Sequence, residues 1–227
     1  LLIEKALNLV GPNAGISPNT GTRLAEAVIT YPAGLTSDQD LVTGNADDIS
    51  IDGFTLDGKD LDGAYLGNGI MSDDSNLTVM NNIVKNFTMV GIWTSSYEFT
   101  TVWDYSYYNS GLLIENNLLF SDLAGRNFDY MGIYVQGDNG VVRGNVVDDA
   151  YRGIQIQPYN NTNATQGLVE GNTVKAYRTP IWFNYSENAA VNWLIKSNTV
   201  EGIPYPSYET PDAWDGLLVQ TFYAGNV

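Results

Sequence analysis

An apolar residue followed three positions later by an asparagine returns along the chain at a nearly constant interval. Five repeats have this pattern, and an earlier repeat has Phe54 in place of the asparagine. The six repeats begin at Ile51, Val79, Ile114, Val142, Val169 and Ile195. Their separations of 28, 35, 28, 27 and 26 residues, the differences between these numbers, are too regular for unrelated elements. Such a period predicts a solenoid, in which each repeat forms one rung of a stack.

A second motif, a glycine or proline followed by an aliphatic residue, comes after the asparagine motif in most repeats. It occurs at Gly91-Ile92-Trp93, Gly132-Ile133-Tyr134, Gly153-Ile154-Gln155, Pro180-Ile181-Trp182 and Gly216-Leu217-Leu218. Apolar residues around both motifs alternate with every second position, whereas a helix would space them by three and four. Successive side chains of a strand point to opposite faces, so this alternation indicates half-buried strands. The sequence therefore predicts an all-β fold with several short strands in each rung.

Acidic residues dominate the charge of the chain. With 26 Asp and Glu against 10 Lys and Arg, the net charge at pH 7 is −16. Nucleic-acid phosphates and anionic membranes attract Lys and Arg, so neither nucleic acid nor a membrane surface is expected as a partner. No apolar run approaches the length of about 20 residues that spans a bilayer, so membrane insertion is not expected. An acidic substrate would need help from a cation such as Ca²⁺, which carboxylate and carbonyl oxygens bind.

The 227 residues include neither cysteine nor histidine. Disulfides, thiolate metal sites and every mechanism that uses imidazole are therefore excluded. The lack of cysteine fits an exported bacterial protein, and an extracellular or cell-surface location is expected. The length suits a single domain spanning residues 1–227. Residues 1–34 form a less regular repeat without a visible cap, which predicts a fragment of a longer repeat protein lacking its N-terminal cap; the oligomeric state is left open.

The repeated asparagines carry a resemblance to a known fold. They are Asn82, Asn117, Asn145, Asn172 and Asn198. Stacked repeats of this kind resemble the right-handed parallel β-helix of the pectate-lyase-like superfamily, including bacterial β-helix repeat proteins. The resemblance implies a single-stranded right-handed parallel β-helix solenoid with an inward Asn ladder, in which each amide bonds to the neighbouring rungs, and with loop insertions on one face. It does not select an activity, because the superfamily includes lyases, hydrolases, epimerases and adhesins.

Acidic turns precede several of the repeats. Stacking would bring Asp48 and Asp74 to one edge of the rungs, together with Asn139, Asn163 and Asn188. Carboxylates gathered in this way could bind Ca²⁺, the one metal that the composition favours. The alternative is that these are turn residues, because Asp and Asn tolerate the left-handed backbone conformation.

An outward row of aromatic and amide side chains is expected beside the second motif. Alternation directs Trp93, Tyr134, Gln155 and Trp182 away from the core, and a second row of Gln136, Gln157 and Asn184 follows two residues later. Sugars stack their CH groups on aromatic rings and bond their hydroxyls to amides, so these seven residues are the candidate substrate-binding site. The alternative is a satellite core covered by the insertions at residues 94–110, 121–130 and 203–214.

The best candidate for catalysis is a cluster of charged residues near one turn. It consists of Asp148, Asp149, Arg152 and Arg178, with Tyr151, Arg143, Tyr177, Arg126 and Asp129 expected nearby. Two adjacent carboxylates would raise the pKa of one of them and permit general acid catalysis, and an arginine could neutralise a uronate. Pectate lyases, which the fold resembles, use an acidic calcium cluster and an arginine base. The alternative is that these charges form surface salt bridges of little energetic value.

Two functions are compatible with these features. The first is an extracellular carbohydrate-interacting β-helix that binds a polysaccharide or cell-surface glycan and cleaves it, as a lyase or a glycoside hydrolase. The second is a non-catalytic surface, adhesin or spacer module of a larger repeat protein, favoured by the missing cap. Turnover of a polysaccharide would distinguish the two.

Overall fold

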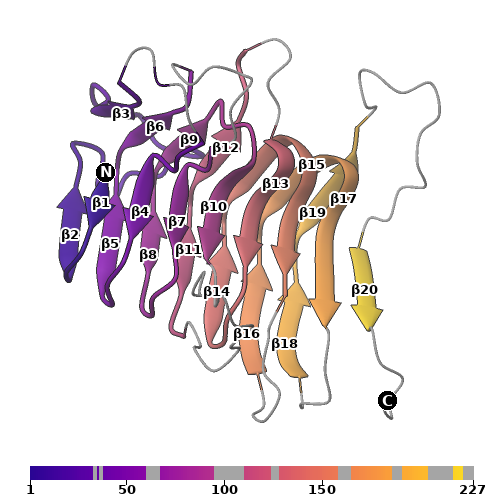
Figure 1. The fold of residues 1–227 in the computed structure, drawn as a ribbon. Helices are drawn as coiled ribbons and strands as arrows, with labels where there is room; N and C mark the ends of the chain where they lie inside the picture. Colours follow the sequence, from indigo (N-terminus) through magenta and orange to yellow (C-terminus); the bar gives the residue numbers. More distant parts are fainter. Residues whose placement is uncertain are drawn as a thin grey trace.

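Every regular element that the structure describes is a β-strand. The computed structural model describes residues 1–32, 35, 38–59, 67–94, 110–123, 128–157, 165–185, 191–203 and 217–221. Its strands form two sheets, and all of their pairings are parallel (Figure 1). The prediction of an all-β chain is confirmed.

One sheet has seven strands and runs along the whole stack. In chain order it contains β2 (Leu7–Val10), β5 (Ile49–Asp52), β8 (Thr78–Met80), β11 (Leu113–Glu115), β14 (Gly140–Arg143), β16 (Thr165–Glu170) and β18 (Val191–Lys196). Each strand pairs with the strand three elements further on until β14, and with the strand two elements further on thereafter. This is the pattern expected when consecutive rungs stack directly on one another.

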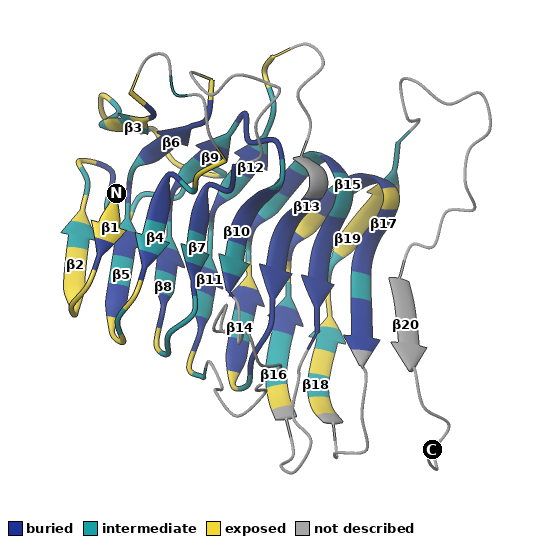
Figure 2. Cartoon of the chain, in the orientation of Figure 1, coloured by how far each residue is buried: buried dark blue, intermediate teal, exposed yellow. Residues whose placement is uncertain are grey.

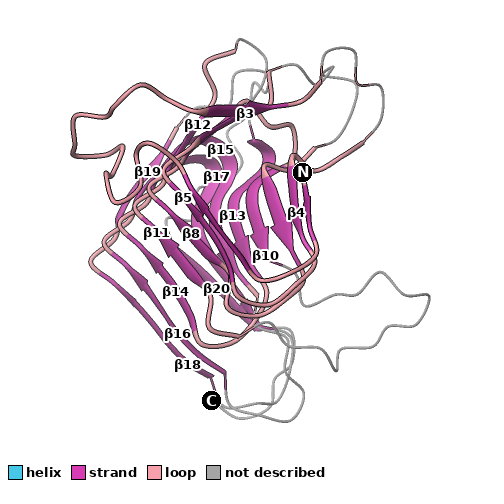
Figure 3. Ribbon diagram, turned by 90° about the vertical axis from the view of Figure 1, so that its left-hand side faces the viewer, coloured by secondary structure: helices cyan, strands magenta, loops and turns pink. Residues whose placement is uncertain are grey.

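The other sheet has thirteen strands and is curled into two arms (Figure 3). The first arm contains β1 (Leu2–Ile3), β4 (Val42–Gly44), β7 (Ile70–Ser72), β10 (Val90–Thr94), β13 (Phe128–Val135) and β20 (Leu217–Thr221). The second arm contains β3 (Val28–Thr30), β6 (Thr55–Asp57), β9 (Ile83–Lys85), β12 (Leu118–Phe120) and β19 (Thr199–Gly202). The long strands β15 (Val146–Ile156) and β17 (Thr173–Tyr185) pair with both arms and so form the corner between them.

The chain passes from the seven-stranded sheet to the second arm, then to the first arm, and back. The six repeat starts predicted from the sequence pair in register, so Ile51 lies beside Val79, Val79 beside Ile114, and so on to Ile195. The 35-residue interval preserves this register, because the extra residues lie between β10 and β11. The repeat is thus a structural rung, and the architecture is solenoid-like.

The hydrophobic core lies between the sheets (Figure 2). Inward side chains from the seven-stranded sheet and from both arms of the other sheet are buried in it, including Ile51, Leu56 and Ile92. At the two ends of the described stack the inward columns reach solvent: Leu7 is 36% exposed and Val200 is 40% exposed, although their strand partners are buried. The interior rungs therefore owe their burial to stacking on both sides.

An asparagine ladder stabilises the corner between the seven-stranded sheet and the second arm. Each ladder asparagine accepts the backbone N–H of the preceding ladder residue through Oδ1, at 2.9–3.0 Å from Phe54 through Asn172. Each also donates its Nδ2 to the carbonyl of the first residue of the preceding repeat, as Asn145 does to Ile114 O at 2.9 Å. The ladder residues are Asn82, Asn117, Asn145, Asn172 and Asn198, and the first four are buried. The inward Asn ladder is therefore present as expected.

The residue before each ladder position has a left-handed backbone. These residues are Gly53, Asn81, Asn116, Gly144, Gly171 and Ser197, with φ between 54° and 81°. Glycine and asparagine adopt this conformation at low cost, which explains why four of the five asparagine repeats read Asn-Asn or Gly-Asn at this point, Ser197 being the exception. Phe54 occupies the ladder position of its repeat. Its backbone N–H donates to Asn82 Oδ1, but its side chain has no amide that could bond to the preceding rung.

An N-terminal segment lies outside the asparagine corner and runs along several rungs. Asn19 Nδ2 donates to the carbonyls of Asn117 at 3.2 Å and Gly144 at 3.1 Å, more than 90 residues away in sequence. Arg23 Nη1 donates to Asn81 O at 2.8 Å, and its guanidinium forms an ion pair with Glu26. The segment ties the first rungs to the middle of the stack.

Candidate functional site

The predicted aromatic and amide row lies on the first arm, on the side away from the main core. Register places Trp93 beside Tyr134, Tyr134 beside Gln155, and Gln155 beside Trp182, as expected. The rings of Trp93 and Tyr134 stack with centroids 5.9 Å apart and an interplanar angle of 16°. They pack in a second apolar cluster with Val90 and Met131, separate from the main core.

The row is buried rather than open. Gln155 is 2% exposed, and Tyr134, Gln136, Gln157 and Asn184 are also buried, while Trp93 and Trp182 are half-buried. The groups bond to one another: Tyr134 Oη donates to Gln157 Oε1 at 2.6 Å, and Gln155 Nε2 donates to the same oxygen at 2.8 Å. Trp93 Nε1 donates to Gln136 Oε1 at 3.2 Å. This packing resembles the satellite core that was the alternative interpretation.

Three polar atoms of this row keep unused hydrogen-bonding capacity. Gln155 Oε1, Trp182 Nε1 and Asn184 Oδ1 are buried and have no hydrogen-bond partner within the described part of the chain. A buried group without a partner costs about 1–3 kcal/mol, so such groups commonly bind water or a ligand hydroxyl. The insertions predicted to border the row were residues 94–110, 121–130 and 203–214. Of these, residues 95–109, 124–127 and 204–214 lie outside the described residues.

An open groove crosses the second arm on the other side of the corner. It has a volume of about 440 Å³ and is lined by Leu118, Phe120, Ser121, Asp148 and Asp149. The first three belong to β12 and the residue after it, and the two carboxylates to β15. Both carboxylates were predicted as candidate catalytic residues. Phe120 was not predicted, although alternation from the buried Leu119 places it on the outer face.

A local irregularity of β15 presents the two carboxylates. The register with β17 shifts between Val147 and Ala150, where the strand passes from the second arm to the first. Asp149 has a left-handed backbone with φ of 68°. Bulges of this kind redirect side chains and are frequent beside functional sites.

The electrostatics of the groove distinguish the two carboxylates. Burial, and then the negative charge of Asp148, raise the pKa of Asp149 above its ordinary value. Asp149 therefore holds its proton to a higher pH than a solvent-exposed aspartate, as a general acid requires.

Replacing Asp149 by asparagine should stabilise the fold at pH 7. Below the pKa of about 3.9 in the unfolded chain, both states carry the proton and burial of Asp149 costs little. As the pH rises through the higher folded pKa, the folded state must ionise a buried group and loses stability. Asparagine removes this loss and tolerates the left-handed backbone, so the melting temperature should rise at pH 7 and approach the wild-type value near pH 3.

Asp122→Asn is the matched control of opposite sign. A hydrogen bond from Lys85 Nζ to Asp122 Oδ2, 2.7 Å long, lowers the pKa of Asp122. This pairing contributes stability above the unfolded pKa that is lost as the pH falls through the folded pKa. Asp122→Asn should therefore lower the melting temperature at pH 7 and converge on wild type in acid. If both variants shifted in the same direction, the electrostatic assignment of Asp149 would be wrong.

The two candidate catalytic arginines stack on aromatic rings beyond the corner. Arg152 lies over Trp182, with its Cζ 4.3 Å from the ring centroid. Arg178 donates from Nη1 to Tyr151 Oη at 2.7 Å and lies 5.7 Å from the centre of the same ring. The predicted cluster is thus divided into carboxylates in the groove and arginines on the neighbouring surface.

The remaining members of the predicted cluster lie elsewhere. Arg143 is on the seven-stranded sheet and forms two hydrogen bonds with Glu115, at 2.9 and 3.1 Å. Tyr177 is buried in β17. Arg126 lies outside the described residues, and the side chain of Asp129 does so too.

Asp48, one of the two predicted calcium ligands, accepts a hydrogen bond from a turn amide, and the backbone N–H of the other, Asp74, donates to Ser72 Oγ at 3.4 Å. Asp48 Oδ1 accepts Asn76 Nδ2 at 3.0 Å, so the residue stacked on Asp48 is Asn76 and not Asp74. Asp48 and Asn76 both have φ of 59°, as the turn interpretation requires. No group of three or more acidic side chains placed to hold a cation occurs among the described residues. The contacts of Asp48 therefore fit a turn better than a metal site.

Comparison with known proteins gives no relative. No family model, no curated protein and no solved structure matches the chain. Among the described residues there is also no helix of the length and apolarity needed to cross a membrane.

Proposed function

We propose that this protein is an extracellular β-helix that binds a polysaccharide or cell-surface glycan in the groove on the second arm. The groove itself supports this proposal, because it joins an aromatic ring to hydrogen-bonding side chains on an open surface. Phe120 and Leu118 offer apolar surface to the CH groups of a sugar, and Asp148, Asp149 and Ser121 offer partners for its hydroxyls. In addition, Gln155, which has an unpartnered Oε1 atom, lies further along β15, and the unpartnered atoms of Trp182 and Asn184 lie on the neighbouring strand β17.

The paired carboxylates favour cleavage of the bound chain. A protonated Asp149 would donate its proton to a glycosidic oxygen, and Asp148 would be the second carboxyl group that glycoside hydrolysis uses. In a lyase, Arg152 or Arg178 would instead neutralise a substrate carboxylate or act as base. The finer fold proposal, a single-stranded right-handed β-helix of pectate-lyase-like type, agrees with the parallel stacking and the ladder.

Phe120→Ala should weaken glycan binding about tenfold, equivalent to about 1.4 kcal/mol. The substitution removes the aromatic floor of the groove and leaves both carboxylates in place. Affinity would be measured by calorimetry on a panel of uronate and neutral polysaccharides, each with Ca²⁺ and with chelator. Leu194→Ala is the control, because Leu194 is 52% exposed on the opposite sheet. Equal affinities for all three proteins would place binding elsewhere, and no binding to any glycan would refute the proposal.

A non-catalytic surface, adhesin or spacer module is the second candidate. The continuous register of the seven-stranded sheet from β2 to β18 favours it, since such a stack forms a stiff rod. Incubation with the glycans that bind, followed by detection of shorter or unsaturated products, separates the candidates. Turnover that disappears in Asp149→Ala would support an enzyme, and binding without turnover would support the module.

A further inference from the structure

The outer surface of the seven-stranded sheet carries an apolar column that is confined to four strands. Leu113, Val141, Leu168 and Leu194 pair in register along β11, β14, β16 and β18. The same column continues on β8, β5 and β2 with polar residues, namely Thr78, Ser50 and Asn8. Leu194 is 52% exposed and the other three apolar residues are half-buried. We call the surface of these four strands the β11–β18 face.

A charged column flanks the apolar one, two residues further along each strand. Its members are Glu115, Arg143, Glu170 and Lys196, which pair in register and alternate in sign. Within the chain, Arg143 bonds to Glu115 at 2.9 Å, and Lys196 lies 3.1 Å from Glu170. Both cations keep nearly half of their side-chain surface exposed, 48% for Arg143 and 46% for Lys196. The charges are thus able to meet further partners.

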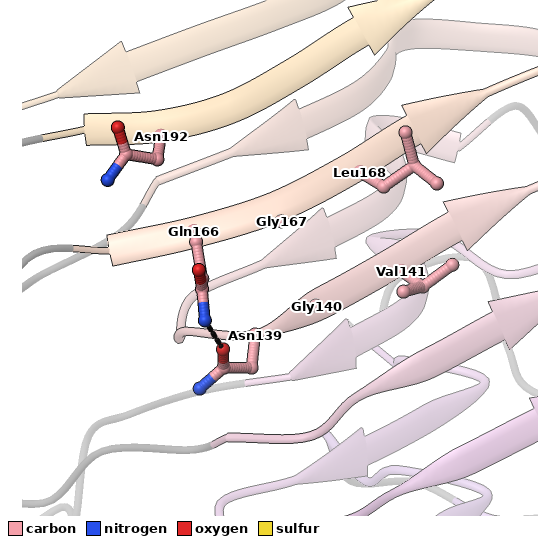
Figure 4. Close-up of a pocket in the computed structure, with 7 residues that line it drawn as sticks. All are labelled: Asn139, Gly140, Val141, Gln166, Gly167, Leu168 and Asn192. Atoms are coloured by element: carbon pink, nitrogen blue, oxygen red, sulfur yellow. Dashed lines mark hydrogen bonds between the residues drawn. The ribbon is translucent and has the colours of Figure 1, made fainter.

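Amides flank the apolar column on its other side, as Figure 4 shows. Asn139, Gln166 and Asn192 border a shallow depression of about 300 Å³ whose floor includes Val141 and Leu168. Gln166 Nε2 donates to Asn139 Oδ1 at 2.5 Å. The β11–β18 face therefore has three parallel columns: amide, apolar and charged.

We propose that the β11–β18 face binds a second copy of this chain across a two-fold axis parallel to its strands. Such an axis lays each column against the same column of the second copy in reverse order. Glu115 then faces Lys196 of the second copy, and Arg143 faces its Glu170, so every charge meets the opposite sign. A self-complementary surface of this kind is what an isologous dimer requires.

The same operation also matches the other two columns. Val141 faces Leu168 of the second copy at the centre, and Leu113 faces its Leu194, so apolar side chains leave water together. Asn139 faces Gln166 of the second copy, and both of these amides donate and accept. A two-fold axis along the stack would instead set each charge against its own copy or against the amide column, so the alternation of sign favours the axis parallel to the strands and a second copy as the occupant. The proposed glycan groove lies on the second arm of the other sheet and stays open in this dimer.

Leu168→Glu tests the apolar column. The wild-type chain should sediment as a concentration-dependent dimer, and Leu168→Glu should be monomeric at the same concentrations, because it buries a carboxylate at the centre of the interface. Ser50→Glu introduces the same charge in the polar continuation of the column and should dimerise like wild type. Unchanged thermal melting of both variants shows that they are folded. A wild-type chain that stays monomeric up to about 0.5 mM, well above typical dissociation constants of dimers, would overturn the proposal.

A fourfold charge swap tests the arrangement. The variant Glu115→Arg, Arg143→Glu, Glu170→Lys, Lys196→Glu keeps the alternation within the chain and the complementarity between two identical copies. It should therefore form its own dimer. Mixed with wild type it should form no heterodimer, because the reversed columns would then oppose like charges at every rung. Heterodimers formed as readily as homodimers, measured with differently labelled chains, would contradict pairing through the charged column.

Discussion

Replacing Asn145 by alanine is expected to lower the free energy of unfolding by about 3 kcal/mol. The Oδ1 atom of Asn145 accepts the backbone N–H of Asn117 at 2.9 Å and its Nδ2 at 3.0 Å. Its own Nδ2 donates to Ile114 O at 2.9 Å. Asn145 is fully buried, so water cannot replace these partners. Alanine would leave a buried donor and a buried acceptor unpaired in the middle of the stack, and chemical denaturation would measure the loss.

The matched variant is Asn198→Ala, at the last described position of the ladder. Asn198 makes the same kinds of bond, accepting from Asn172 N at 2.9 Å and donating to Val169 O at 2.9 Å. Its bonds are only partly buried, because no further rung of the described chain covers it. Water can therefore take over, and a loss of about 1 kcal/mol is expected. Losses of equal size at the two positions would show that burial does not determine the strength of the ladder.

The ladder is also where sequence reasoning was most successful. An asparagine three residues after an aliphatic residue, repeated at nearly constant spacing, predicted both the rung and the inward amide. The prediction succeeded because the stacked rungs impose the same local requirement at every repeat. Asp48 shows the limit of this reasoning: the sequence placed Asp74 near it, but the register places Asn76 beside Asp48, two residues away.

The candidate site was predictable only in part. Asp148 and Asp149 stood out because adjacent carboxylates are unusual, and both line the groove. Phe120 did not stand out, since one aromatic residue at the end of an apolar run resembles a core residue. Alternation gave the direction of Gln155 correctly, but not its burial, which depends on what packs against the outer face. The contacts of Asn19 with Asn117 and Gly144 had no local signal at all, because they join residues 98 and 125 positions apart.

The glycine of the second motif has a physical reason that the repeat alone did not reveal. In Gly153, a Cβ atom would overlap the Val174 side chain and the Pro180 carbonyl oxygen. In Gly132, one rung earlier, it would overlap Val147 in the same way. At the corner between the two arms, inward valines of the second arm thus pack directly against the backbone of the first. The second motif has glycine at these two positions because the corner leaves no room for a side chain.

Gly153→Ala is therefore expected to destabilise the fold by about 3 kcal/mol, near the upper end for overpacked cores. Relief would require moving β17, whose carbonyl at Pro180 is one of the two obstacles. Gly171→Ala is the control: nothing lies within 4 Å of a Cβ there, and only the left-handed φ of 64° opposes the substitution. Strain of about 1 kcal/mol is expected for it. Denaturation of both variants measures the difference, and a smaller loss for Gly153→Ala than for Gly171→Ala would mean that the two arms are not packed this closely.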